Sequence, residues 1–170
     1  GDGISIAMGH GGQFDDQNTE PAFWSPVSVF TRKDGSTARF PHLMADRAKP
    51  GLIAVNRLGK RFCNEAENYH DFVRAMIADR NNESAPFAYL ICDSVFVRKY
   101  AFGAVPPLAS ERRKLKKVGY LIEASTIDEL AAKIGVDASS LHQTLSRYNA
   151  DAAAGVDSEF GKGEIGRAHV

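Results

Sequence analysis

Residues 50–72 have the sequence PGLIAVNRLGKRFCNEAENYHDF, and the architecture of the whole 170-residue chain can be inferred outward from them. The stretch begins with a short apolar strand, Leu52–Val55, which is followed directly by Asn-Arg-Leu-Gly. Gly59 can adopt the positive φ that a tight turn requires, and the side chain of Asn56 can hydrogen-bond the turn backbone. The sequence therefore predicts a tight turn over residues 56–59.

A second short strand is expected after the turn, over residues 60–63, so that the two strands form a hairpin. Asn64 and Glu65 would follow it and open the helix that presents Tyr69. A hairpin that ends in polar, ionisable side chains can hold them at a cleft. Residues 64–69 are therefore the first place in the chain to look for chemistry.

The rest of the chain predicts an α+β fold, with short hairpins followed by helices. Apolar residues within 68–80 recur with the i, i+1, i+4, i+5 spacing of an amphipathic helix. Thr126 and Glu129 form a capping box, and Asp137 caps a second, longer helix. The predicted elements are, in chain order, an irregular strand over 22–30, a turn over 33–36, a strand over 38–43, a helix over 68–80, a strand over 87–92, a helical turn after Asp93, and helices over 127–134 and 138–154.

Composition and charge exclude several classes of partner. Lysine plus arginine and aspartate plus glutamate both total 21, so the formal net charge is zero and no nucleic acid or anionic membrane is an expected partner. No apolar run reaches the roughly 18 residues of a membrane span. The basic run at residues 112–117 is interpreted as a solvated helix face rather than an anion-binding patch, because the overall charge is balanced.

Cys63 and Cys92 are the only two cysteines, and they lie far apart in the sequence. They are expected to be reduced intracellular thiols, which favours a cytoplasmic location. The histidines and cysteines show neither H-x-H nor C-x-x-C spacing, so no metal site is predicted.

The chain opens on Gly1-Asp2-Gly3, at the start of a short helical stretch. Taken alone, G-D-G is an ordinary turn and helix N-cap, because short glycine motifs often match by chance. The helices predicted over 127–154 likewise look like packing elements when they are judged by their chemistry.

Three patterns, taken together, resemble a known family. The pattern P-G-x-I-x-V-N-x-x-G-x-R-F-x-N-E-x-x-x-Y of residues 50–69 resembles one found in flavoproteins of the fumarate reductase and 3-ketosteroid dehydrogenase superfamily. Residues 1–3 resemble the T-G-D-G-x-x-M-A segment that closes their dinucleotide-binding domain, and residues 126–163 resemble the cap domain of the ketosteroid dehydrogenase branch. The resemblance covers the chain as far as about residue 163 and implies the cap (catalytic) domain of a two-domain flavoprotein.

The resemblance also implies a division of the chain and a cofactor, FAD. Residues 1–16 would be the C-terminal tail of the flavin-binding domain, and residues 17–163 would be the cap, or substrate, domain. Asp2 would contact FAD, with Gly1 and Gly3 as its flanks. The G-x-G-x-x-G loop that binds the FAD pyrophosphate does not occur in this sequence and is expected upstream, so the chain would be a fragment that does not hold FAD by itself.

Tyr69 is the candidate catalytic base. In the dicarboxylate-reducing branch of the superfamily an arginine at the matching position donates a proton, whereas in the ketosteroid branch a tyrosine is implicated in removing one. A phenol with an ordinary pKa of ~10 is a poor base at neutral pH unless hydrogen bonds or positive charge stabilise the phenolate. A half-buried packing role is the alternative for Tyr69, and His70 is the next candidate base.

Phe23 and Trp24 are candidate substrate-binding residues that would form part of an apolar pocket wall. Phe23 stands where fumarate reductases carry the histidine of Q-x-H-P, which binds a substrate carboxylate. An aromatic pair suits a planar, apolar substrate better than a dianion, and core packing would explain the pair equally well. Tyrosine in place of arginine and phenylalanine in place of histidine together argue against fumarate chemistry.

The resemblance thus implies an FAD-dependent dehydrogenase of the 3-ketosteroid 1-dehydrogenase type. Such an enzyme introduces a C=C bond next to a ketone and passes hydride to the flavin, with a small apolar ketone or steroid-like molecule as substrate. Two alternatives stay open: a catalytically inactive fragment or binding module, and a fumarate reductase-like reductase of another unsaturated substrate. The sequence does not indicate an oligomeric state.

Residues 164–170, EIGRAHV, match the translation of GAG-ATC-GGA-AGA-GCA-CAC-GTC, a widely used sequencing-adapter string. They are interpreted as an artefact and are expected to lie outside the fold.

Overall fold

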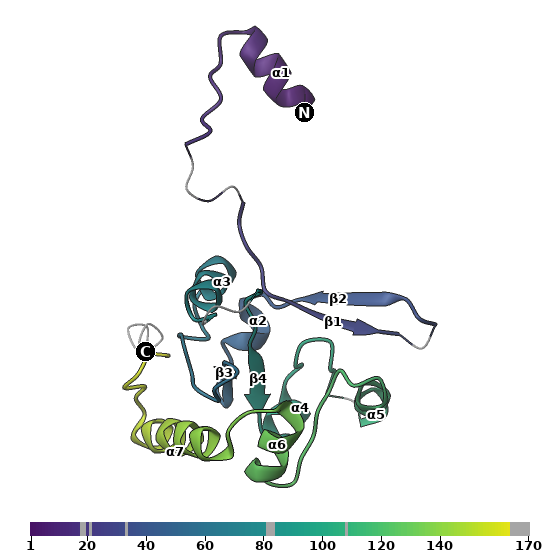
Figure 1. Ribbon diagram of the computed structural model, residues 1–170, viewed down its shortest axis with the longest axis vertical. Coiled ribbons are helices and arrows are strands. Elements are labelled where there is room, and N and C mark those ends of the chain that lie inside the picture. The colour runs from purple at the N-terminus through teal and green to yellow at the C-terminus, as the bar shows by residue number, and fades with distance from the viewer. Residues whose placement is uncertain (18–19, 21, 33, 81–83, 108, 164–170) are drawn as a thin grey trace.

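Figure 1 shows the computed structural model of the chain, which describes residues 1–17, 20, 22–32, 34–80, 84–107 and 109–163. Its elements are α1 (Asp2–Gly9), β1 (Val27–Thr31), β2 (Thr37–Pro41), α2 (Met44–Arg47), β3 (Leu52–Val55), α3 (Tyr69–Ala78), β4 (Tyr89–Cys92), α4 (Ser94–Lys99), α5 (Ala109–Lys117), α6 (Ile127–Ile134) and α7 (Ala138–Ala154). Helices combined with small antiparallel sheets confirm the predicted α+β class. Lys33, within the predicted 33–36 turn, and residues 164–170 lie outside the described residues.

The tight turn over residues 56–59 is confirmed. Gly59 has φ +73° and donates its N–H to the Asn56 carbonyl at 3.0 Å. The Asn56 side-chain oxygen accepts from the N–H groups of Leu58 and Lys60 at 2.9 and 3.0 Å. A Cβ on Gly59 would also lie only 3.2 Å from the backbone nitrogen of Leu141 in α7. Glycine is therefore required here both for its φ and for the close approach of a helix.

The predicted second strand over residues 60–63 is wrong. β3 pairs along its whole length with β4, in the antiparallel register Leu52↔Cys92 to Val55↔Tyr89. Residues 60–63 contribute only an isolated bridge between Val55 and Arg61. β4 pairs with one edge of β3, and a side chain binds the other edge. There the backbone N–H of Ala54 donates to the Glu65 carboxylate at 3.0 Å, in the place where a second strand would pair.

The core forms on both faces of β3, because successive side chains of a strand point to opposite sides. Ile53 and Val55 pack against α6 and the start of α7, in a cluster with Ala131, Ile134 and Leu141. On the other face, Ala54 packs with Cys63 and with Phe72 of α3. Every residue of β3 is buried, which makes this strand the centre of the structure.

The helix boundaries predicted from local sequence are confirmed. The Thr126 hydroxyl accepts from the N–H of Glu129 at 3.1 Å, while the Glu129 carboxylate accepts from the N–H of Ser125 at 2.7 Å, so the reciprocal half of the capping box is displaced by one residue. Asp137 caps α7. A glycine in the left-handed conformation ends both α6 and α7.

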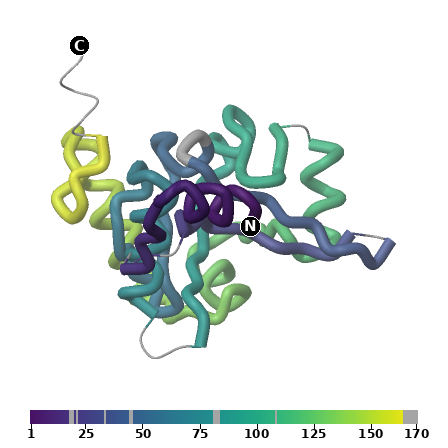
Figure 2. Tube along the Cα trace, turned by 90° about the horizontal axis from the view of Figure 1, so that it is seen from above, coloured from purple at the N-terminus to yellow at the C-terminus, as the bar shows by residue number. Residues whose placement is uncertain are grey.

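Helix α1 lies well away from the rest of the chain, as Figure 1 shows, and none of its eight described residues is buried. Its side chains Ile4, Ile6 and Met8 are 44%, 65% and 57% exposed. In the view from above in Figure 2, the β1–β2 hairpin projects to one side, away from α7. Among the described residues, no helix has the length and apolar character needed to cross a membrane.

Candidate functional site

Tyr69 is the first residue of α3, and its side chain is partly exposed. Asn68 caps the helix, because its side-chain oxygen accepts from the N–H groups of His70 and Asp71, both at 3.0 Å. The buried residues of α3 include Phe72, which anchors the first turn to the core below β3. Capping and burial together hold Tyr69 at the surface on a rigid helix start.

The expectation that Asn64 and Glu65 open this helix is wrong. Asn64 instead begins a separate turn, in which its carbonyl accepts from the N–H of Glu67 at 3.1 Å and its side chain accepts from the N–H of Ala66 at 2.9 Å. Glu65 is fully buried because its carboxylate is bound by Arg61. The turn over 64–67 thus connects the core to the start of α3.

Arg47, at the end of α2, clamps this turn. Its fully buried guanidinium donates to the carbonyls of His42, Glu65 and Glu67 at 3.1, 2.9 and 3.2 Å. It also lies over the Phe72 ring, 4.3 Å from the centroid. Burial lowers the pKa of Arg47, and nearby acidic groups partly offset this shift. The guanidinium nevertheless stays protonated, because the ordinary pKa of arginine lies far above neutral pH.

Arg61 joins the same turn to the C-terminal part of the chain. It donates two hydrogen bonds to Glu65, both at 2.9 Å, and two to Asp157, both at 2.8 Å. The Nζ of Lys162 lies 3.3 Å from Glu65 Oε2. Although burial opposes it, hydrogen bonding to Asp157 and Glu65 raises the pKa of Arg61, and the same contact holds the pKa of Asp157 below its ordinary value. Arg61 and Asp157 are therefore both charged near neutral pH.

Phe23 and Trp24 lie beside the first turn of α3, where both contact His70, the residue that follows Tyr69. The Phe23 ring meets the His70 ring edge-on, with 5.3 Å between centroids. The backbone N–H of Trp24 donates to His70 Nδ1 at 3.1 Å. Core packing, the alternative for this pair, is excluded because Phe23 is 81% and Trp24 40% exposed.

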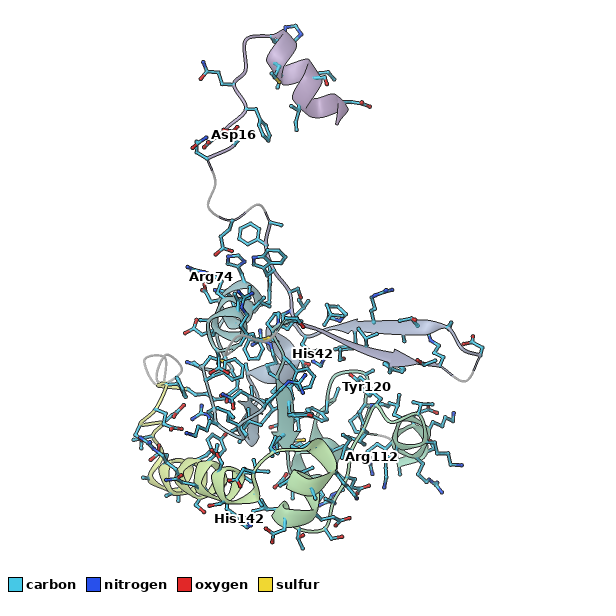
Figure 3. All side chains as sticks on the ribbon, in the orientation of Figure 1. Asp16, His42, Arg74, Arg112, Tyr120 and His142 are labelled. Atoms are coloured by element: carbon cyan, nitrogen blue, oxygen red, sulfur yellow. The ribbon has the colours of Figure 1, made fainter. Side chains whose placement is uncertain are left out.

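Glu20 completes the cluster, although no motif in the sequence points to it. Its Oε2 accepts from the Trp24 indole N–H at 3.1 Å and lies 3.1 Å from His70 Nε2. Its Oε1 lies 2.8 Å from Arg74 Nε. Figure 3 labels Arg74 on α3, where the segment leading from α1 reaches the rest of the structure. Donors from two distant segments therefore converge on one carboxylate.

Asp2, Gly1 and Gly3 are not brought near Tyr69, because they begin α1, which lies apart from α3 (Figure 1). Asp2 is exposed in the first turn of α1, and no atom lies within 4 Å of a Cβ built on Gly1 or Gly3. An open helix start with an acidic side chain can accept a hydrogen bond from a sugar hydroxyl. The residues present thus fit one contact with FAD, but they lack the glycine loop that would bind its pyrophosphate.

His42, which follows β2, is buried in a chain of hydrogen bonds. Its Nδ1 lies 2.5 Å from Asp46 Oδ2 and its Nε2 lies 2.8 Å from Ser28 Oγ. The Ser28 hydroxyl lies 2.7 Å from the Tyr120 hydroxyl, which accepts from the N–H of Ala104 at 3.0 Å. These contacts tie β1 to α2 and to the loop before α5, so they brace the hairpin.

Both cysteines are free thiols, and Cys63 is buried. Burial raises the pKa of each thiol, that of Cys92 to about 12, so neither is a thiolate at neutral pH. Within the part of the chain that the structure describes, no group of three or more His, Cys, Asp or Glu side chains could hold a metal ion.

Comparison with known proteins identifies the family, because the family model described as FAD binding domain matches residues 1–168. The chain belongs to this family. It is 44% identical to 4-oxocyclohex-2-ene-1-carboxylate 5-dehydrogenase of Sinomonas cyclohexanicum, over 96% of this chain and 28% of that protein. It is 31% identical to 3-oxosteroid 1-dehydrogenase of Mycobacterium tuberculosis, over 96% of this chain and 29% of that protein.

A solved structure of the FAD-binding family supports the same assignment. The crystal structure of 3-ketosteroid delta1-dehydrogenase from Sterolibacterium denitrificans, in complex with 1,4-androstadiene-3,17-dione, matches with a TM-score of 0.69 and 32% identity, over 96% of this chain and 29% of that one. The resemblance inferred from residues 50–69 is therefore confirmed, and FAD is the cofactor of the family. The chain spans less than a third of the length of the curated relatives that it matches.

Proposed function

We propose that residues 17–163 are the cap, or substrate, domain of an FAD-dependent dehydrogenase that introduces a C=C bond next to a ring ketone. The observation that carries this proposal is that Phe23 and Trp24 both contact His70, the residue after Tyr69, at the exposed first turn of α3. The relatives named above are dehydrogenases of cyclic ketones by their names, which supports the same reaction.

Residues 1–16 are assigned, on the same proposal, to the end of the flavin-binding domain. The isolation of α1 from the other elements supports this division (Figure 1). So do its exposed apolar residues Ile4, Ile6 and Met8, which a folded domain would cover. Asp2 is the residue of this segment that we assign to FAD.

FAD, when bound, supplies an acceptor for hydride. The residues of this chain perform the remaining tasks. The Tyr69 oxygen takes the proton from the carbon next to the ketone, and the bond electrons left there form the C=C bond as hydride departs from the neighbouring carbon. Phe23 offers an exposed apolar ring against which a flat ring ketone can pack.

Fumarate-type reduction is disfavoured by the same positions. Tyr69 stands where the dicarboxylate-reducing branch carries its proton-donating arginine, and Phe23 stands where that branch carries a carboxylate-binding histidine. A phenol and a phenyl ring cannot together bind a dianion.

A chimera tests this function. This chain replaces the matching segment of the Sinomonas dehydrogenase, the purified protein is checked for bound flavin by absorbance, and flavin bleaching by 4-oxocyclohex-2-ene-1-carboxylate is followed without oxygen. We expect Tyr69→Phe to slow bleaching by about 10²–10⁴-fold with flavin content unchanged, because it removes only the proton-moving hydroxyl. Tyr100→Phe is the matched control, since Tyr100 packs on Phe96 at the end of α4.

Two results would contradict the proposal. One is a chimera that binds flavin normally and is not bleached by the ketone. The other is a Tyr69→Phe chimera that bleaches as fast as the Tyr100→Phe control, which would make Tyr69 a packing residue.

A further inference from the structure

We propose that Trp24, His70 and Arg74 form a carboxylate site for the substrate, and that Glu20 occupies this site until a substrate displaces it. The ligand class is a cyclic ketone that carries a carboxylate on its ring. This inference rests on the proposed function, because it takes the cluster beside Tyr69 to be the substrate side of the molecule.

The geometry of the carboxylate site comes from three side chains of different chemistry. The indole N–H of Trp24 and the Nε2 of His70 each lie 3.1 Å from one oxygen of Glu20. The Nε of Arg74 lies 2.8 Å from the other oxygen. A single carboxylate is therefore bound through both of its oxygens, in the pattern that proteins use to recognise carboxylate ligands. Glu20 shows what the site binds.

The tautomer of His70 is fixed by its neighbours. A backbone N–H can only donate, so the contact from Trp24 N–H requires that Nδ1 of His70 be an acceptor. In the neutral ring the proton is then on Nε2, which faces Glu20. His70 thus presents its Nε2–H as a donor to the carboxylate, while the lone pair on Nδ1 already accepts from the Trp24 N–H. This argues that His70 recognises the substrate rather than removing its proton.

The positive charge of Arg74 is available to a ligand. Its second acidic neighbour, Asp71, lies 3.6 Å from Nη1, beyond hydrogen-bond distance, and Asp71 is itself held by the Asn68 side-chain amide at 2.6 Å. The side chains of Arg74 and Glu20 are 58% and 32% exposed. An ion pair this open to solvent contributes little to stability, so a ligand can replace Glu20 at small cost.

The carboxylate site adjoins the residues proposed for the ketone. The Phe23 ring is in edge contact with His70, and Tyr69 precedes His70 in the same turn of α3. A ring lying on Phe23 could therefore carry a carboxylate toward Arg74. The Sinomonas relative, by its name, acts on a ring with both a ketone and a carboxylate, whereas a neutral steroid carries no carboxylate for the three donors to bind.

Trp24 supplies the assay, because it is the only tryptophan of the chain. The full chain is titrated with 4-oxocyclohexane-1-carboxylate and, separately, with its uncharged carboxamide, and indole fluorescence is recorded. We expect the acid to bind about 10- to 100-fold more tightly than the amide, from the loss of charge-assisted hydrogen bonds in the amide complex. Glu20→Gln should tighten binding of the acid, because a tethered carboxylate competes at about millimolar effective concentration.

In Arg74→Gln, the acid should bind no more than about twofold more tightly than the amide, because the charged donor is lost. Arg113→Gln, an exposed arginine on α5, is the matched control and should leave the preference intact. Equal binding of acid and amide by the Glu20→Gln chain, or an unchanged preference in Arg74→Gln, would overturn the carboxylate site.

The outcome separates this inference from the proposed function. Tyr69→Phe should leave the preference for the acid unchanged, because the phenol is not among the three donors. A chain that shows no preference for the acid, while Tyr69→Phe still slows flavin bleaching in the chimera, refutes the carboxylate site and leaves the dehydrogenase proposal standing. A clear preference for the acid together with an unaffected bleaching rate refutes the role of Tyr69 and leaves the carboxylate site standing.

Discussion

Replacing Arg61 by methionine should expose how much of the fold depends on one buried guanidinium. Methionine keeps an apolar stem but removes five hydrogen bonds: two to Glu65, two to Asp157 and a longer one, at 3.5 Å, to Glu159. The carboxylates of Glu65 and Asp157 would remain buried, since their side chains are 0% and 4% exposed. The substitution thus leaves two acidic groups in the interior without their principal partner.

The size of the effect follows from what remains. Breaking a buried ion pair by removing one partner costs about 3–5 kcal/mol. Lys162 still lies 3.3 Å from Glu65, and Asp157 still accepts from the backbone N–H of Lys162 at 3.0 Å. These contacts favour the lower part of the range, about 3–4 kcal/mol. At about 2–4 °C per kcal/mol for a chain of this size, the melting temperature should fall by about 6–16 °C.

Thermal and urea denaturation, followed by circular dichroism, measure this effect. Arg147→Met is the matched control, because Arg147 lies 3.2 Å from Glu159 but is 56% exposed. An exposed pair contributes about 1 kcal/mol or less, so the control should remain close to the wild type.

The stability that Arg61 contributes should decrease in acid. The pKa of Asp157 is lowered in the folded chain, so its contribution to stability is present above its unfolded pKa and is lost as the pH falls toward the folded value. The stability difference between wild type and Arg61→Met should therefore be constant near neutrality and shrink below about pH 4. If Arg61→Met costs no more than Arg147→Met at pH 7, the ion cluster does not stabilise the fold and the reasoning is refuted.

Three further outcomes are expected. FAD titrated into the purified chain should give no saturable change in flavin absorbance, because Asp2 without a glycine loop cannot hold the pyrophosphate; micromolar binding would contradict this. Deleting residues 164–170 should leave the melting temperature unchanged, since this stretch matches an adapter sequence, and a drop of several degrees would show that it packs. Gly59→Ala should cost more stability than Gly135→Ala in urea melts: both residues have φ near +70°, worth about 1–2 kcal/mol, but a Cβ meets a backbone atom only at Gly59. Equal losses of stability in the two variants would mean that α7 moves aside to make room for the Cβ at position 59.

Local structure could be predicted from the sequence because its causes lie within a few residues. The turn at Asn56 and Gly59 depends on one side-chain oxygen and one positive φ, and both are visible in the sequence. The caps at Thr126 and Asp137 follow from the hydrogen bond that a short polar side chain makes to the next turn. Each of these features can be predicted without knowing how the rest of the chain folds.

Strand pairing and the site could be predicted only in part, because they depend on distant residues. Two possible partners follow β3 in the sequence, and the nearer one, residues 60–63, is the prediction that local spacing favours. The partner in the structure is the more distant β4, and a carboxylate 11 residues away, at Glu65, binds the other edge of β3. Phe23 and Tyr69 were identified through a family pattern, and the structure places both at the start of α3. Glu20 and Arg74 carry no motif, so only the fold shows that they meet.

The distribution of burial explains how one short helix can serve as a site. Arg47 and Arg61 are buried and spend their hydrogen bonds on the turn over 64–67, which fixes the backbone that leads into α3. The groups that we assign to a ligand are exposed at the first turns of α3, where Trp24 and Arg74 contact the Glu20 carboxylate that a ligand would replace. Breaking the hydrogen bonds of a buried arginine costs much free energy, whereas an exposed arginine can exchange one carboxylate partner for another at little cost. In the arrangement that we propose, buried arginines position Tyr69 and an exposed arginine binds the substrate.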